Sequence, residues 1–154
     1  YSAYYSRNEQ AAVADYVITM AYDEFYSGSK EAGPVSSISY VRNASENILK
    51  EVPANQSIIG LPFYSRLWKE TTKNGETKLS SEACSMKYAE ELISDAKAEL
   101  KWNEQTGLEY AENSKSLAMK LETVNSHKMA GAAFWKAGME KKNVWDTIEK
   151  YMAQ

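Results

Sequence analysis

The sequence predicts an α/β fold built on a parallel β-sheet, and three short apolar segments separated by helical stretches are the basis of this prediction. Each segment is a nearly continuous run of β-prone residues, which is typical of strands buried on both faces of a parallel sheet. The three segments are residues 15–22, 57–64 and 129–135. Between the first two, apolar residues recur at helical spacing from Ile38 to Val52, and Pro53 ends that helix. The order strand, helix, strand is that of a βαβ unit.

The segment after the second expected strand has a different character. It is polar and contains Asn74-Gly75, the preferred centre of a two-residue hairpin turn. An amphipathic helix is expected over residues 86–96, followed by short strands at 100–102 and 107–110. We therefore expect an α+β insertion inside the α/β fold. The expected division is residues 1–66, with two strands and their helix, residues 67–112, with the insertion, and residues 113–154, with the last strand and its flanking helices.

Two further helices are expected around the third strand. One contains Leu117, Leu121 and Val124, with Ser114 or Ser116 as its cap, and the other closes the chain. Three strands cannot form a complete eight-stranded β/α barrel, which needs about 250 residues. The strand pattern therefore leaves two alternatives open, a small open three-layer domain or part of a barrel that lacks five β/α units.

Composition excludes several classes of function. The net charge of −3 gives no basic surface for nucleic acid, and the longest apolar runs are too short to span a membrane. No secretory signal is visible at the start, so we expect a cytosolic protein or an internal piece of a longer precursor. Cys84 is the only cysteine and His127 the only histidine, which argues against a disulfide, a multi-cysteine metal site and a Ser-His-Asp system. No metal or cofactor is expected.

The three expected strands end in similar chemistry. In parallel α/β proteins ligands bind at the carboxyl ends of the strands. Aromatic faces there would stack on the C–H faces of a sugar, and an arginine would offer its hydroxyls a fixed fork of donors. The alternative is that the rings only fill the top of the sheet. The strand-end residues are Met20, Tyr22, Asp23 and Glu24 at the end of the first strand, Pro62, Tyr64 and Arg66 at the end of the second, with Trp68 just beyond, and Phe134 and Trp135 in the third.

The same segments resemble a known family. Met20-Ala21-Tyr22-Asp23 is similar to the M-x-Y-D of the sixth barrel strand of family 18 glycoside hydrolases, the chitinase-like enzymes. Residues 60–66 resemble the family's seventh-strand G-x-P-x-Y-x-R, and residues 131–135 resemble its eighth strand, which ends in tryptophan. Within the family the similarity is greatest to the bacterial cell-wall and spore-cortex branch. The resemblance implies the last three β/α units of a (β/α)8 TIM barrel, with the insertion between the last two strands.

The resemblance also implies roles for individual residues. Tyr22 would donate its hydroxyl to the N-acetyl group of a bound N-acetylglucosamine, with Asp23 nearby and Trp135 as the floor. Tyr64 and Arg66 would line the groove. Met20 would pack beneath the site, and Glu24 is included as a neighbour outside the core motif.

The family's chemistry is substrate-assisted hydrolysis, in which the N-acetyl oxygen attacks the anomeric carbon while a glutamate protonates the leaving oxygen. That glutamate closes a D-x-x-D-x-D-x-E motif on the fourth strand, and this motif does not occur in the 154 residues. The resemblance therefore implies a glycan-binding part of a glycosidase with no catalytic residue of its own.

The resemblance further implies a peptidoglycan or chitin ligand, an extracytoplasmic location and a missing N-terminal barrel half as partner. Two alternatives stay open. One is a non-catalytic carbohydrate-binding module, and the other is a structural protein that forms homo-oligomers through its open sheet edges.

Overall fold

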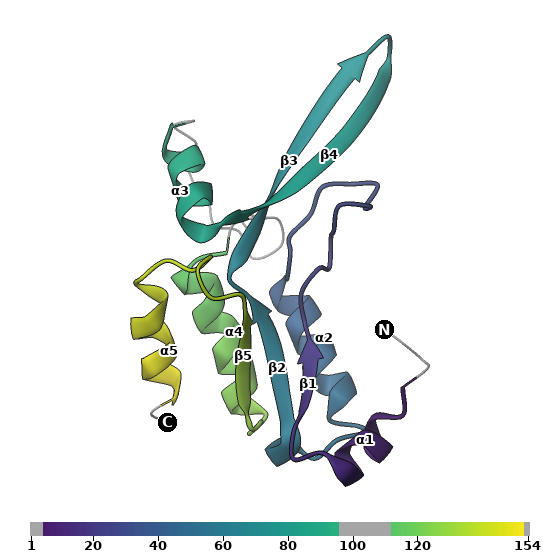
Figure 1. Cartoon of the computed structure of the whole chain (residues 1–154), viewed down its shortest axis with the longest axis vertical. Helices are drawn as coiled ribbons and strands as arrows, with labels where there is room; N and C mark the ends of the chain where they lie inside the picture. The colour runs from purple at the N-terminus through teal and green to yellow at the C-terminus, as the bar shows by residue number, and fades with distance from the viewer. Residues whose placement is uncertain (1–4, 96–111, 153–154) are drawn as a thin grey trace.

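The computed structural model describes residues 5–95 and 112–152, and Figure 1 shows how they are arranged. The short strands expected at 100–102 and 107–110 lie outside the described residues. A 3₁₀ turn, η1, covers Ala54–Gln56. The other elements, in chain order, are α1 (Arg7–Val13), β1 (Val17–Met20), α2 (Ile38–Ile48), β2 (Ser57–Pro62), β3 (Tyr64–Lys73), β4 (Glu76–Ser85), α3 (Met86–Asp95), α4 (Ser114–Ser126), β5 (Gly131–Trp135) and α5 (Val144–Met152).

The three predicted strands form one parallel sheet in the order β1-β2-β5. Met20 pairs with Gly60 on the next strand, and Gly60 pairs in turn with Ala133. All three strands therefore run in the same direction, and their carboxyl ends meet at one edge of the sheet. The predicted α/β class and the parallel order of the strands are confirmed.

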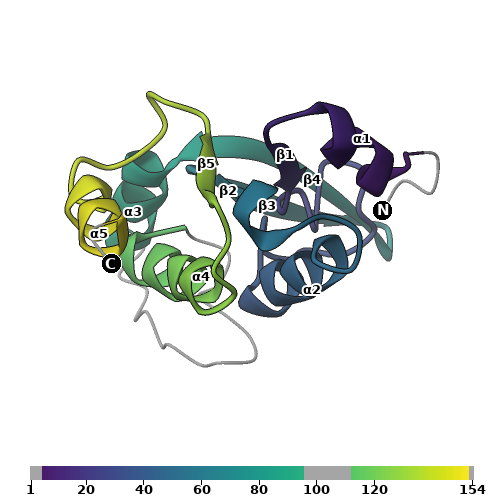
Figure 2. The same cartoon turned by 90° about the horizontal axis from the view of Figure 1, so that it is seen from below.

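Helices cover only one face of this sheet. Figure 2 shows α2 and α4 on the same side of the three strands. The apolar core lies there, and Ile59 and Leu61 are completely buried in it. On the opposite face Ile18, Met20 and Trp135 are 55%, 67% and 57% exposed. The expectation that the strands are buried on both faces is therefore wrong for β1 and β5, whose residues are exposed or only half-buried on this face. It holds for most of the central strand β2, in which Gly60 and Pro62 are buried as well as Ile59 and Leu61.

The predicted hairpin is longer than expected and begins earlier. β3 starts at Tyr64, with only Phe63 between it and β2, and pairs with β4 from Tyr64↔Ser85 to Lys73↔Glu76. Asn74 and Gly75 connect the strands with φ of 53° and 81°, the left-handed conformation that a type I′ turn requires at both positions. The hairpin projects away from the parallel sheet (Figure 1). The expected boundary between residues 66 and 67 falls inside β3.

The helices differ from the predictions at their ends. α2 stops at Ile48 instead of Val52, although the Val52 N–H still bonds to the Ile48 carbonyl at 2.9 Å. α4 is capped by Asn113, whose side chain accepts from the Ser116 N–H, while the Ser116 hydroxyl accepts from the Asn113 N–H. The expected cap, Ser114 or Ser116, is therefore wrong. Asn113 is the N-cap, and Ser116 occupies the third helical position of the capping box. α1 was not predicted.

Candidate functional site

The site begins at Asp23, just beyond the carboxyl end of β1. Asp23 has φ of 58°, a left-handed conformation that aspartate tolerates better than most residues. Its Oδ1 accepts a hydrogen bond from the Tyr64 hydroxyl at 2.5 Å. The Arg66 Nη2 lies 3.7 Å from the same oxygen. The loop after β1 and the start of β3 therefore meet at one carboxylate.

Tyr64 and Arg66 point to the same side because alternate residues of a strand share a face. Arg66 also donates from Nη1 to the Ser81 hydroxyl on β4 at 3.3 Å. Its side chain is only 10% exposed, and its Nε has no hydrogen-bond partner within the described part of the chain. Among the described residues, the Nε–H of this buried guanidinium is therefore a donor without an acceptor.

The Tyr64 hydroxyl stays protonated at physiological pH. Burial raises its pKa, and the hydrogen bond to Asp23 and the negative charge of that carboxylate raise it further. Burial and the charge of Asp23 also raise the pKa of Tyr22. The two rings meet edge to face with centroids 6.3 Å apart. Both hydroxyls are therefore hydrogen-bond donors at one edge of the sheet.

A pocket of about 330 Å³ lies beside this group, on the open face of the sheet. This volume is at the lower end of the range of small-ligand pockets, about 300–1,000 Å³. Its walls are apolar and aromatic, which suits the C–H face of a sugar ring. The lining residues are Ile18, Met20, Tyr22, Gly60, Ala133, Phe134 and Trp135.

Gly60 brings the pocket wall close to the Tyr22 ring. A Cβ on Gly60 would lie 3.3 Å from the Met20 Cα, which is tighter than ordinary packing, and 3.4 Å from the Tyr22 ring, which is the near limit of ordinary contact. Gly60 was not predicted as a site residue, although its place in the G-x-P-x-Y-x-R segment was a signal for it. Phe134 was noted at the end of the third strand but given no role in the site. Ile18 and Ala133 were not predicted, because ordinary apolar strand residues carry no such signal.

The seven predicted site residues do not all play the same part. Met20, Tyr22 and Trp135 line the pocket, while Asp23, Tyr64 and Arg66 form the polar group beside it. The carboxylate of Glu24 is held by Ser37 instead. Its Oε2 accepts from the Ser37 N–H at 2.7 Å, and its Oε1 accepts from the Ser37 hydroxyl at 3.0 Å.

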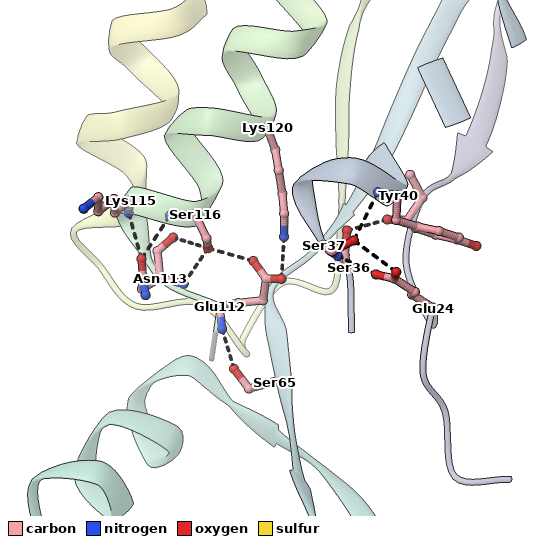
Figure 3. A network of polar contacts seen from close by, with 11 residues as sticks. Glu24, Ser36, Ser37, Tyr40, Ser65, Glu112, Asn113, Lys115, Ser116 and Lys120 are labelled. Atoms are coloured by element: carbon pink, nitrogen blue, oxygen red, sulfur yellow. Dashed lines mark hydrogen bonds and ion pairs between the residues drawn. The ribbon is translucent and has the colours of Figure 1, made fainter. Parts of the chain in front are cut away.

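A second, buried acid lies behind the site and was not predicted. The Glu112 carboxylate pairs with the Lys120 amine and accepts from the Ser116 hydroxyl at 2.9 Å. The Glu112 N–H donates to the Ser65 hydroxyl at 2.8 Å, so this pair is joined to the residue between Tyr64 and Arg66. Figure 3 shows the Glu112 group and the Glu24–Ser37 group. Glu112 is not marked in the sequence, because its partners Ser116 and Lys120 are ordinary helix residues and Ser65 is distant. Glu24 was predicted as a neighbour of the site, but its bonds to Ser37 were not.

The described residues offer no metal centre and no membrane span. Among them, no three His, Cys, Asp or Glu side chains gather in a way that could hold a metal ion. None of the described helices has the length and apolar character needed to cross a bilayer.

Comparison with known proteins gives consistent matches over nearly the whole chain. Residues 1–140 match the model of the glycosyl hydrolases family 18. The uncharacterized glycosylase YvbX of Bacillus subtilis is 28% identical over an alignment of 151 residues, and the match covers 89% of this chain and 42% of YvbX.

Solved structures agree on the fold. A chitinase from Chromobacterium violaceum has a TM-score of 0.79 at 23% identity, over 97% of this chain and 49% of the chitinase. The spore cortex-lytic enzyme SleL of Bacillus megaterium has a TM-score of 0.74 at 22% identity, over 92% of this chain and 34% of SleL. The chain thus spans less than half the length of each of these proteins.

Proposed function

The chain belongs to family 18 of the glycosyl hydrolases, and we propose that it forms one side of the sugar-binding site of a glycosidase acting on N-acetylglucosamine-containing glycans. The observation that carries this proposal is the Asp23–Tyr64–Arg66 group beside an aromatic pocket at the carboxyl ends of parallel strands. Ligands bind at this edge in parallel α/β folds. Peptidoglycan or chitin is the proposed glycan, because the matched proteins include a spore cortex-lytic enzyme and a chitinase.

In this proposal the pocket holds one pyranose ring and the polar group fixes its N-acetyl arm. Trp135 would stack under the ring, since its side chain is 57% exposed on the pocket wall. The protonated hydroxyl of Tyr22 would donate to the N-acetyl oxygen, and Asp23 would accept from the amide N–H. An N-acetyl group oriented in this way can attack the anomeric carbon, which is the substrate-assisted route of retaining hydrolysis.

The proton donor for the leaving oxygen would come from elsewhere. The D-x-x-D-x-D-x-E motif is absent from the sequence, and the open sheet face with Ile18 and Met20 exposed is a surface that further barrel strands would cover. The proposed partner is therefore the other half of a (β/α)8 barrel, for which the described strands would be the sixth, seventh and eighth. A reading frame that precedes Tyr1 and lacks this motif would contradict the proposal. An extracytoplasmic location, at the cell wall or spore, belongs to the same proposal.

The binding part of the proposal is tested by titrating the whole chain with N-acetylglucosamine oligomers and with muropeptides. We expect the tryptophan fluorescence to change, and we expect Trp135→Ala to lower the affinity by about ten- to a hundredfold in calorimetry, since burying an aromatic side chain contributes about 1.5–3 kcal/mol. Tyr88→Ala is the matched control, because Tyr88 is a half-exposed aromatic on α3 that does not line the pocket. An equal effect of both substitutions would contradict the assignment.

The catalytic part is tested by incubating the chain alone with the same oligomers. We expect no new reducing ends, because no residue of this chain is in the role of the acid. Measurable turnover would show that the chain does contain a residue able to protonate the leaving oxygen. Binding without turnover, together with an upstream frame that has no acid motif, would favour the alternative of a non-catalytic binding module.

A second candidate is self-association, favoured by the open edges of β1 and β5 and the exposed apolar face between them. Light scattering at micromolar concentration tests it. A concentration-dependent dimer that excludes the oligomers would support this candidate, and a strict monomer would contradict it.

A further inference from the structure

We propose that Glu24 is a positioning residue, which clamps the loop after β1 to the start of α2 and so fixes the Asp23 carboxylate against the Tyr64 hydroxyl, without touching the sugar itself. This inference goes beyond the resemblance, which treats Glu24 only as a neighbour of the motif. The inference is tested by an affinity arm, which measures oligosaccharide binding and rests on the proposed function. It is also tested by a spectroscopic arm, which uses the sugar-free chain and does not rest on it.

The first step is the backbone of Asp23. With φ of 58° this residue is in the left-handed region, which is uncommon for non-glycine residues, although aspartate tolerates it better than most. The hydrogen bond to Tyr64 depends on this conformation, because it sets the direction in which the carboxylate leaves the chain. Contacts that hold the chain on either side of Asp23 would keep the carboxylate pointing in this direction.

The second step is the set of bonds on either side of Asp23. Before it, the Ala21 carbonyl accepts a hydrogen bond from the buried Ser36 hydroxyl at 2.6 Å. After it, the Glu24 N–H donates to the Val35 carbonyl at 2.9 Å. The two residues between these anchors, Tyr22 and Asp23, are thereby bracketed by one short segment, residues 35–37.

The third step is the Glu24 side chain. Both of its carboxylate oxygens accept from Ser37, one from the N–H and one from the hydroxyl. Ser37 is the N-cap of α2, and its Oγ also accepts from the Tyr40 N–H at 3.1 Å (Figure 3). A carboxylate at a helix N-terminus is stabilised by the helix dipole and by the free N–H groups there. Both oxygens of Glu24 are thus occupied on the side of α2.

The fourth step is the rigid placement of α2, the helix to which the Glu24 side chain is bonded. α2 is fixed in the core by Val41 and Ile48, which are 0% and 1% exposed. The clamp therefore ties Asp23 to a buried helix. On the other side of the contact, Tyr64 continues directly from the buried strand β2 through Phe63. Asp23 and Tyr64 are therefore both anchored to the same apolar core. This keeps the Asp23 Oδ1 and the Tyr64 hydroxyl at hydrogen-bond distance in the absence of a sugar.

The spectroscopic arm uses the whole chain without sugar, labelled with ¹³C at the tyrosine ring carbon that bears the hydroxyl. Tyr64→Phe assigns the Tyr64 resonance, and Asp23→Asn gives its position when the carboxylate is lost. We expect Glu24→Ala to move the resonance most of the way to the Asp23→Asn position. Glu24→Gln, which keeps one acceptor oxygen for the Ser37 N–H, should move it less. Glu46→Ala, an exposed acid on α2, should leave it unchanged.

The affinity arm measures oligosaccharide binding to the same variants. We expect Glu24→Ala to weaken binding by up to about tenfold, the scale of one hydrogen bond. The effect should be largely absent when Asp23→Asn is already present, because a positioning residue acts only through the residue it positions. Ser37→Ala removes only the hydroxyl partner of the clamp and provides a milder variant if Glu24→Ala does not fold.

The outcomes separate the proposals. Weaker binding with an unmoved Tyr64 resonance, or effects of Glu24→Ala and Asp23→Asn that simply add, would mean that Glu24 touches the sugar and would overturn the inference. A folded Glu24→Ala variant with both readouts unchanged would overturn it as well. If the unsubstituted chain binds no oligosaccharide, the proposed function fails, while the Tyr64 resonance still decides the role of Glu24.

Discussion

Replacing Lys120 with methionine removes the positive member of a buried ion pair while keeping a side chain of similar length. The side chains of Lys120 and Glu112 are 1% and 2% exposed. After the substitution the Ser116 hydroxyl is the one side-chain donor that the described residues still offer to the Glu112 carboxylate. A charge left in this place has neither water nor a counter-charge.

The expected cost is about 3–5 kcal/mol, the range for breaking a buried pair by removing one partner. Burial already raises the pKa of Glu112, and the charge of Lys120 opposes that shift. Without Lys120 the pKa rises further. A carboxyl with a raised folded-state pKa is most favourable to stability below its ordinary value of 4.5, and this contribution is lost as pH rises towards the raised value. The deficit of the variant should therefore shrink as the pH falls towards 4.5.

Urea unfolding followed by circular dichroism measures this deficit at several pH values. Glu112→Leu combined with Lys120→Met should recover most of the lost stability, because replacing both members of a buried pair with apolar residues is often neutral or stabilising. The Ser116 hydroxyl still has the Asn113 carbonyl as an acceptor in that variant. Lys142→Met, at an exposed position, is the control and should change stability by less than about 0.5 kcal/mol.

Two results would refute this reasoning. One is a Lys120→Met variant that loses less than about 1 kcal/mol at neutral pH, since the carboxylate would then have another source of stabilisation. The other is a double variant no more stable than the single one, which would mean that packing of the lysine stem, and not its charge, is what the site needs.

Three further substitutions test other parts of the structure. Tyr64→Phe removes the donor to Asp23 and should lower oligosaccharide affinity by about tenfold or more while costing about 1.5–3 kcal/mol of stability, the range for a hydrogen bond to a charged group; unchanged binding in calorimetry would contradict the site. Phe63→Ala should cost about 3–5 kcal/mol in urea unfolding, since Phe63 is 1% exposed in the core. Gly60→Ala should cost about 1–3 kcal/mol and reduce binding, because its methyl group would lie 3.3 Å from the Met20 Cα; a fully stable variant with normal affinity would show that this close approach is not required.

Much of the local structure follows from the sequence because neighbours along the chain determine it. The β-prone runs predicted all three parallel strands, and Asn74-Gly75 predicted the hairpin, since both central residues of its turn have positive φ. The same runs did not indicate that one sheet face would be open. An apolar strand residue such as Ile18 gives the same local sequence pattern whether or not another part of this chain packs on it.

The α/β class, the strand segments and the family follow from the sequence alone, and the family in turn indicates the residues from which a sugar site could be built. The contacts that these residues make with one another depend on the tertiary structure. The contact between Tyr64 and Asp23 joins positions 41 residues apart, and the Glu112 N–H reaches Ser65 across 47. Such distances are set by the packing of helices and strands on a common core. No local pattern therefore distinguishes Glu24, whose oxygens are held by Ser37, from Asp23, whose carboxylate meets the tyrosine.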